Sequence, residues 1–593
     1  MKIIQQMRTL FSIFRSQKYL ALLLFFVMIF SALSESLSLG MIMPFFEAIT
    51  VSNGQPAGSL KYFHPLLKHF PEYYKTLIIG AIFLMLILLK NILYILGKWL
   101  SLKFVFNLRK FWMDKVMGKY MNVEYSYFLS QKQGVLLNNL IAEPVRASKA
   151  IQQIIIFFSN AILALFLYAL MILAQWQFAL ILSVITMLIV FSLRKTTYKY
   201  SIGVGENQLV LSQKINAIAA ESINAIRQIK LFSMGKKVHK EFLNKLDEML
   251  KVLLRFKIIS SLPRPINESL IVTIFIAFLL YLQYIKQSSL INIVPVVALY
   301  VMISQRFFNI AAQLYADRMT IFTFLPSVKL LYSLGNSDIK DEILDSGKVI
   351  DKLEDDIIFD NVSFSYSASK PLFQNLSLVV PEGKITAIVG TSGAGKSTIV
   401  DLIVGLVRKQ GGRIIINRVD LSEINLSSWR NSIGYVSQDM FIFNATVREN
   451  ILAGNQDASE DEIIAAAKKA NAAQFIERLP QGYDTLLGEK GLKISGGERQ
   501  RISIARCLIR NPELLIFDEA TNALDSESEK LIQKSIDNLK GQKTIIIIAH
   551  RLTTIMDADK IIVLDKGKIV EEGMHSELIG MKGLYWRLAE NAI

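Results

Sequence analysis

The residues best suited to chemistry form one glycine-rich run, Gly390-Thr391-Ser392-Gly393-Ala394-Gly395-Lys396-Ser397-Thr398. An apolar stretch expected to be a strand, Ile385 to Val389, precedes it, and an apolar helix follows it. In that setting the glycines let backbone N–H groups surround phosphate, Lys396 reaches the β- and γ-phosphates of a nucleotide, and Ser397 ligates Mg²⁺. The run therefore predicts a site for ATP and Mg²⁺, and its setting makes a chance glycine-rich turn a poor alternative.

Two neighbouring acids, Asp518 and Glu519, follow a second apolar strand, Leu514 to Phe517. Ligands of α/β proteins bind at the carboxyl ends of such strands. We expect Asp518 to join the Mg²⁺ shell and Glu519 to polarise the attacking water as a general base. An acidic N-cap of the next helix would explain one acid but not the pair.

A third expected strand, Thr544 to Ala549, ends in His550, and a fourth, Ile433 to Val436, is soon followed by Gln438. A lone histidine is usually structural, but the end of a core strand favours a γ-phosphate sensor at His550. Gln438 by itself would indicate nothing.

Taken in chain order, these motifs resemble the ATP-binding cassette (ABC) family, and the run Ile494-Ser495-Gly496-Gly497-Glu498 carries the resemblance. It is similar to the family signature Leu-Ser-Gly-Gly-Gln, with Ile for Leu and Glu for Gln. The resemblance implies that Ser495, Gly496, Gly497 and Glu498 complete an ATP site on a second subunit. It further implies an adenine-stacking Tyr366, a Mg²⁺-sensing and catalytic Gln438, and an inter-subunit loop at Asp525. The ATP-binding residues thus expected are Tyr366, Gly390, Ser392, Gly393, Gly395, Lys396, Ser397 and Thr398.

The elements ahead of these motifs are apolar enough to lie in a membrane. Of the 593 residues, 52% are hydrophobic, and the long apolar runs all fall before residue 309. A bilayer core is spanned by about 17–25 apolar residues. We expect six transmembrane helices, at 19–49, 77–102, 151–173, 178–193, 269–284 and 291–308. The composition excludes a disordered or fibrous protein, and the single cysteine, Cys507, excludes an intramolecular disulfide.

The formal net charge of +16 arises from 66 basic and 50 acidic residues. Many Lys and Arg residues fall in the connections 103–150 and 194–257, so the positive-inside rule places these connections and both termini in the cytoplasm. Much of the charge is therefore topological, and no nucleic-acid partner is expected. We expect an integral, multi-pass protein of the bacterial inner membrane with a cytoplasmic nucleotide-binding domain.

The expected fold is an α-helical six-span transmembrane domain fused to an α/β P-loop ABC ATPase domain. We expect the transmembrane domain over residues 1–335, a linker over 336–356 and the nucleotide-binding domain over 357–593. This order resembles exporter-type (type IV) half-transporters. Because one chain carries one cassette, two chains are needed for two ATP sites, and we expect a homodimer, with a heterodimer left open.

Charges within the expected spans point to the cargo, because each is costly near the bilayer centre. Lys90, Arg264 and Arg306 suggest a basic cavity for an anionic head group such as phosphate or pyrophosphate. The alternative is snorkelling of these side chains, or an ion pair with Glu35.

Two further runs, Met43-Pro44-Phe45 and Leu262-Pro263-Arg264, resemble bacterial lipid-linked oligosaccharide flippases. That resemblance implies a lipid or lipid-linked, amphipathic anionic substrate that leaves the cytosolic leaflet by alternating access of a dimer. A multidrug or peptide exporter is the nearest alternative, and a non-transporting membrane ATPase or regulator is a more distant one.

Overall fold

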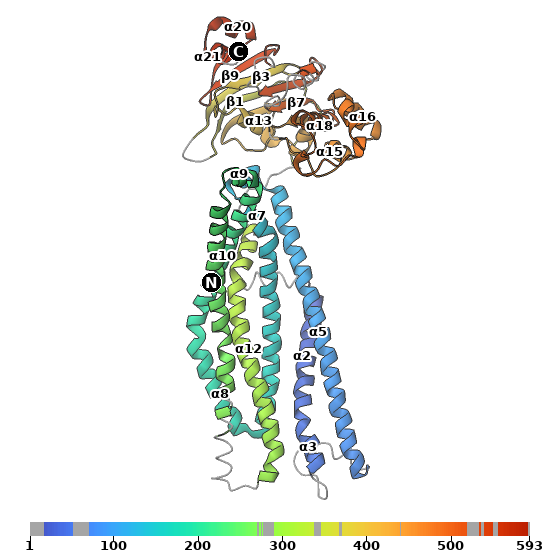
Figure 1. The fold of residues 1–593 in the computed structure, drawn as a ribbon, viewed down its shortest axis with the longest axis vertical. Helices are drawn as coiled ribbons and strands as arrows, with labels where there is room; N and C mark the ends of the chain where they lie inside the picture. Colours follow the sequence, from blue (N-terminus) through green and yellow to red (C-terminus); the bar gives the residue numbers. More distant parts are fainter. Residues whose placement is uncertain are drawn as a thin grey trace. The chain divides into compact units, whose positions relative to one another are not determined.

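The computed structural model describes residues 17–50, 70–269, 272–273, 276, 290–336, 346–366, 371–438, 440–518, 530, 533–534, 539–548 and 555–590. The chain forms two compact units (Figure 1). The first comprises Met1–Met121 and Ser130–Ile339, and the second comprises Asn122–Leu129 and Lys340–Ile593.

Long helices build the first unit. They are α2 Lys18–Gly40, α3 Ile42–Thr50, α5 Glu72–Asn122, α7 Gln133–Leu137, the π-helix η2 Asn138–Ala142, α8 Glu143–Asn224, α9 Ile226–Leu231, α10 Gly235–Ser261 and α12 Leu290–Asn336. Helix α5 has 51 residues. At 1.5 Å per residue such a helix is about 75 Å long, more than twice the ~30 Å bilayer core. It therefore extends well beyond the membrane.

Three helical stretches among the described residues are long and apolar enough to span a bilayer: Lys18–Phe45, Tyr74–Asn122 and Gln133–Leu173. Only 6% of the most apolar window in Tyr74–Asn122 is buried within the protein, which leaves its apolar side chains for lipid. The six-span count is not confirmed, because most of the expected fifth span and the side chains of much of the fourth lie outside the described residues.

Helix α8 is the centre of the first unit and contacts α2, α10 and α12. The two ends of α8 lie side by side (Figure 1). The Ser212 hydroxyl, near the end of α8, donates over 2.9 Å to Oδ1 of Asn138, which lies just before the start of α8. Gly134 makes this approach possible, since a Cβ there would lie 2.4 Å from the carbonyl oxygen of Asn216. An apolar core that includes Leu167, Met171 and Phe308 joins α8 to α12.

Two sheets build the second unit. A six-stranded sheet has the order β10-β9-β3-β8-β7-β6, and a four-stranded antiparallel sheet has the order β2-β1-β4-β5. In the larger sheet β9, β3, β8, β7 and β6 are parallel, and β10 is antiparallel at one edge. The strands are β1 Ile357–Phe364, β2 Phe373–Val380, β3 Ile385–Gly390, β4 Gly411–Ile416, β5 Val419–Asp420, β6 Ile433–Val436, β7 Leu514–Asp518, β8 Thr544–Ile548, β9 Lys560–Asp565 and β10 Lys568–Gly573.

Helices complete the second unit. They are α6 Tyr125–Ser130, whose last residue belongs to the first unit, then α13 Lys396–Ile403, α14 Leu426–Asn431, α15 Val447–Leu452, α16 Glu460–Lys469, α17 Ala473–Arg478, α18 Gly496–Leu508, α20 His575–Met581 and α21 Leu584–Glu590. Glu124, just ahead of α6, forms an ion pair of 3.0 Å with Arg408. The segment 122–129 is thus early in the sequence yet packs with the late domain.

The central strands are buried on both faces, as parallel strands usually are. Along β7, Leu515 and Phe517 enter one hydrophobic core with α15 and α18, whereas Leu514 and Ile516 enter another with α13 and the four-stranded sheet. Successive strand residues point to opposite faces. Helices α13 and α18 therefore cover opposite faces of the larger sheet.

Candidate functional site

The glycine-rich run forms the turn between β3 and α13, as expected from the sequence. Gly395 has φ 106°, in the left-handed region, and a Cβ there would lie 2.6 Å from the Phe373 ring. Only glycine fits this position. Lys396 is 7% exposed, and its Nζ donates to the carbonyl oxygens of Gly390 (3.0 Å) and Thr391 (3.2 Å). The lysine charge is thus held at the turn, where phosphate would bind.

The oxygen ligands expected for Mg²⁺ meet at the end of β7. Ser397 Oγ lies 3.4 Å from Asp518 Oδ1, and the Asp518 residue is 5% exposed. A hydroxyl and a buried carboxylate fit Mg²⁺, which prefers hard oxygen ligands. The Tyr435 hydroxyl donates to the other carboxylate oxygen, Oδ2, over 3.2 Å. Because β6 pairs Tyr435 with Ile516, Tyr435 and Asp518 are diagonal neighbours on one face of the sheet.

A second acid shares this environment. Burial and the nearby charge of Asp518 raise the pKa of Asp401 to about 6. The Tyr366 hydroxyl contacts Asp401 Oδ2 at 3.4 Å and Thr398 Oγ1 at 3.3 Å, and burial raises its pKa. The Tyr366 ring packs edge-on against Phe364, and the residue is 53% exposed. The aromatic ring expected to meet adenine therefore lies over the start of α13 and remains accessible.

The signature-like run caps helix α18. Ser495 is the N-cap, and Glu498 completes a capping box: the Ser495 N–H and hydroxyl donate to Glu498 Oε2 at 2.7 and 2.8 Å. An acid in the first turn also interacts favourably with the helix dipole. Glu498 thus stabilises the start of α18. Gly496 and Gly497 follow as the first two residues of α18.

The other residues expected at the ATP site are either exposed or outside the described part of the chain. Gln438 is exposed, two residues after β6. Ser392 and Gly393 are exposed on the turn before α13. Glu519, Asp525 and His550 lie outside the described residues, so their roles stay predictions.

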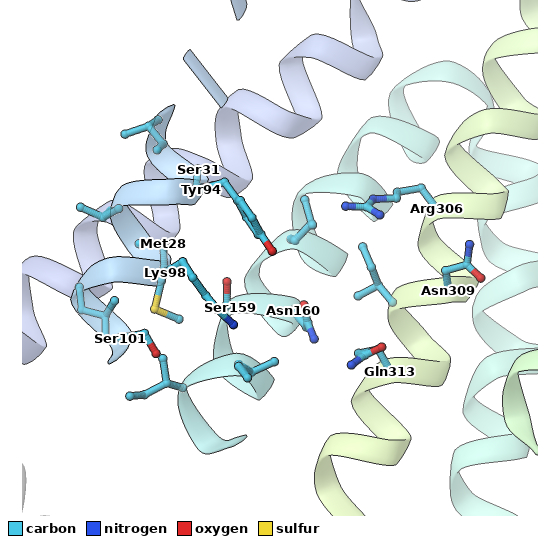
Figure 2. Close-up of a pocket in the computed structure, with 18 residues that line it drawn as sticks. Met28, Ser31, Tyr94, Lys98, Ser101, Ser159, Asn160, Arg306, Asn309 and Gln313 are labelled. Atoms are coloured by element: carbon cyan, nitrogen blue, oxygen red, sulfur yellow. The ribbon is translucent and has the colours of Figure 1, made fainter. Parts of the chain in front are cut away.

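The first unit contains a cavity of about 320 Å³ between α2, α5, α8 and α12 (Figure 2). Figure 2 shows Tyr94 and Lys98 reaching from α5 toward Ser159 and Asn160 of α8. Helix α12 supplies Arg306, Asn309 and Gln313, and α2 supplies Met28 and Ser31. The wall combines two cations with amides and hydroxyls, although the helices around it are largely apolar.

The three basic residues singled out from the sequence have different surroundings. Arg306 lines the cavity and forms an ion pair with Glu35 of α2, to which its Nε donates over 2.7 Å. Arg264 forms an ion pair with Glu268 at 3.1 Å, and its side chain is 73% exposed. Lys90 is half-buried on α5 and is not among the residues that line the cavity.

Sequence reasoning missed Lys98 and Tyr435. Lys98 lines the cavity eight residues after Lys90, and no acidic partner for it is found in the described part of the chain. Its place on the same helix, two turns after Lys90 and nearer the basic connection 103–150, was the available signal. Tyr435 could have been found only by aligning β6 with β7 in register.

Comparisons with known proteins agree with this architecture. The family model described as "ABC transporter" matches residues 373–522, and the model described as "ABC transporter transmembrane region" matches residues 18–310. The heterocyst differentiation ATP-binding protein HepA of Nostoc sp. is 31% identical over 97% of this chain and 95% of its own. The ATP-dependent lipid A-core flippase of Salmonella typhimurium is 34% identical over 83% of each chain. The structure of a bacterial Atm1-family ABC exporter with ATP bound superposes with a TM-score of 0.79 at 26% identity, over 96% of this chain and 97% of that one.

Proposed function

Because the chain belongs to the ABC transporter family and is an exporter-type half-transporter whose cassette is an ATPase, we propose that it moves an amphipathic anionic substrate out of the cytosolic leaflet. The expected fold class, a helical transmembrane domain fused to a P-loop ABC ATPase domain, is confirmed by these matches. A lipid or a lipid-linked molecule is the cargo that we favour. The relative from Salmonella typhimurium, named as a lipid A-core flippase, supports that choice.

The cavity among the helices is the observation that carries this proposal. Lys98 and Arg306 line it within a helical unit that presents apolar side chains outward. Charges among membrane helices are costly and usually mark a substrate path. Arg306 shares its charge with Glu35, so Lys98 is the cation that we assign first to a phosphate-like head group. Lys90 and Arg264 remain secondary candidates from the sequence.

ATP binding and hydrolysis would use the residues gathered at β3, α13 and β7. Lys396 and the turn hold the phosphates, while Ser397, Asp518 and Gln438 would hold Mg²⁺, which neutralises phosphate charge when bound. We assign the general base to Glu519 and γ-phosphate sensing to His550. Tyr366 is positioned to meet the adenine ring.

Two chains would be required for each complete ATP site. Helix α13 and the signature helix α18 cover opposite faces of the larger sheet, which supports a Ser495–Glu498 signature that serves the phosphate site of another chain. A second chain would supply its signature to the first chain's phosphate site, and its Asp525 to the contact between cassettes. Since Glu519 and Ser495 occur in the same chain, a homodimer would build two equivalent sites.

The protein is an integral membrane protein, and we place it in a bacterial inner membrane with the ATPase unit in the cytoplasm. The excess of Lys and Arg in the connections 103–150 and 194–257 supports this orientation. Closure of two cassettes on ATP, followed by release after hydrolysis, would drive alternating access.

Substrate-stimulated ATP hydrolysis in proteoliposomes tests the proposal. We expect a polyprenyl diphosphate lipid to stimulate hydrolysis without any ion conductance, and the Glu519→Gln variant to show no stimulation. Stimulation by apolar cations or by peptides, but not by the lipid, would favour a multidrug or peptide exporter. ATP hydrolysis that no substrate alters would favour a non-transporting ATPase.

A further inference from the structure

Asp317 of α12 is a buried acid that the proposed mechanism does not use. It is 1% exposed, and its carboxylate accepts hydrogen bonds from three side-chain amides, those of Gln153 and Asn160 on α8 and Gln313 on α12. The bonds from Asn160 and Gln313 measure 2.9 and 3.4 Å. No ion pair to Asp317 is found among the residues that the structure describes.

Such a carboxylate is a costly way to join two helices. Burial of an ionised group without a counter-charge is strongly unfavourable, and an apolar pair of similar volume would pack α8 against α12 at lower cost. Burial raises the pKa of Asp317, and the hydrogen bonds from the three neutral amides oppose that rise by stabilising the ionised form without neutralising it. Because Asp317 bonds to two residues of the cavity wall, Asn160 and Gln313, we ask whether it sets the orientation of their amides.

Each of the three amides turns its nitrogen toward Asp317, the orientation that an ionised carboxylate requires because it can only accept hydrogen bonds. The carbonyl oxygen on the other branch of each amide then points away from the acid. Asn160 and Gln313 both line the cavity (Figure 2). Within the described part of the chain no donor is found for either carbonyl oxygen. Asp317 thus fixes two amides so that their oxygens are left to accept bonds from another molecule.

We propose that Asp317 is a positioning residue that gives this part of the cavity wall hydrogen-bond acceptors and thereby selects a hydroxyl-rich head group, that of a sugar-bearing lipid. The proposal rests on the proposed transport of an anionic lipid, and it adds a second contact to that substrate. Lys98 would take the phosphate, and the Asn160 and Gln313 oxygens would accept from sugar hydroxyls. An anionic lipid without a sugar would use the first contact alone.

The test compares two synthetic lipids, a polyprenyl diphosphate that carries one hexose and the same lipid without the sugar. Their affinities for the full-length protein in nanodiscs of neutral phosphatidylcholine would be measured by displacement of a fluorescent lipid. We expect the wild type to bind the sugar-bearing lipid several-fold more tightly. In Asp317→Asn that preference should disappear while affinity for the sugar-free lipid is kept. Asp247→Asn, which changes an exposed acid on α10, is the matched control and should keep the preference.

Gln313→Met gives a second, milder test, because it removes one acceptor and leaves Asp317 bonded to Gln153 and Asn160. It should weaken binding of the sugar-bearing lipid about fivefold, the change expected for one lost hydrogen bond, and leave the sugar-free lipid unchanged. Equal wild-type affinities for both lipids, or equal losses for both in the variants, would overturn the role of Asp317 and leave anionic-lipid transport standing. Failure of both lipids to bind the wild type would overturn the proposed function as well.

Discussion

Replacement of Lys98 by methionine should weaken binding of the substrate strongly without disturbing the packing of the helices. Among the described residues, Lys98 and Arg306 are the two cations that line the cavity. Lys98 is exposed on α5 at the cavity wall, and methionine keeps much of its length while removing the charge. Arg306 is a poorer probe, because its removal would also leave the half-buried Glu35 without its partner.

The expected size follows from the contact that Lys98 would make. An ammonium and a phosphate about 4 Å apart attract by roughly 4 kcal/mol at an effective dielectric constant of 20, before desolvation and side-chain ordering are subtracted. Hydrogen bonds to charged groups contribute about 1.5–3 kcal/mol net. We therefore expect the half-saturating concentration of an anionic lipid to rise at least about tenfold.

The assay is lipid-stimulated ATP hydrolysis by the full-length protein in nanodiscs, with lipid concentration varied at two salt concentrations. Maximal stimulation should change little, because the ATP site is untouched. The wild type should weaken more than Lys98→Met as salt is raised. Lys110→Met is the matched control, since Lys110 is an exposed lysine on the same helix that does not line the cavity. Equal effects of the two variants would refute the assignment of Lys98.

Three further outcomes are expected at the ATP site. Glu519→Gln should retain bound ATP and lose turnover, measured as nucleotide occlusion and phosphate release, and near-normal hydrolysis would contradict the role of Glu519. Tyr435→Phe removes the bond to Asp518 and should raise the Mg²⁺ concentration needed for tight nucleotide binding severalfold, whereas an unchanged requirement would show that the bond is dispensable. Asp401 has a pKa raised from 3.8 to about 6, so the native state holds this proton more tightly than the unfolded chain and stability falls as pH rises through that window. Asp401→Asn should therefore raise the free energy of unfolding at pH 7.5 by on the order of 1–2 kcal/mol, seen as a higher melting temperature, but should not raise it at pH 4. An equal gain at both pH values would rule out titration as the cause.

The phosphate site could be predicted from the sequence because its parts are local. A strand, a glycine turn and a helix are contiguous, and the glycine at 395 is required by a left-handed φ that the motif itself implies. Asp518 could be placed beside it because parallel strands bring their carboxyl ends to one edge. The contact between Tyr435 and Asp518 could not, since it depends on the register of two strands that are distant in the chain.

For the cavity, the sequence could predict its basic character but not which residues line it. Counting residues along a helix gives the depth of a lysine but not the direction it faces around the helix axis, and Lys98 rather than Lys90 faces the cavity. The partner of Arg306 is Glu35, 271 residues away, so neither periodicity nor spacing selects that pair among the possible ones. The environment of Asp317 likewise requires α8 and α12 to be packed together.

The most direct test of the account is the leaflet position of the lipid itself. Proteoliposomes with outward-facing ATPase units would carry a fluorescent polyprenyl diphosphate lipid, and a membrane-impermeant reductant would report the fraction accessible from outside. We expect that fraction to fall with time only when ATP and Mg²⁺ are added to the wild type, and to stay constant in Glu519→Gln. Steady ATP hydrolysis with an unchanged accessible fraction would contradict ATP-driven transport of this lipid class.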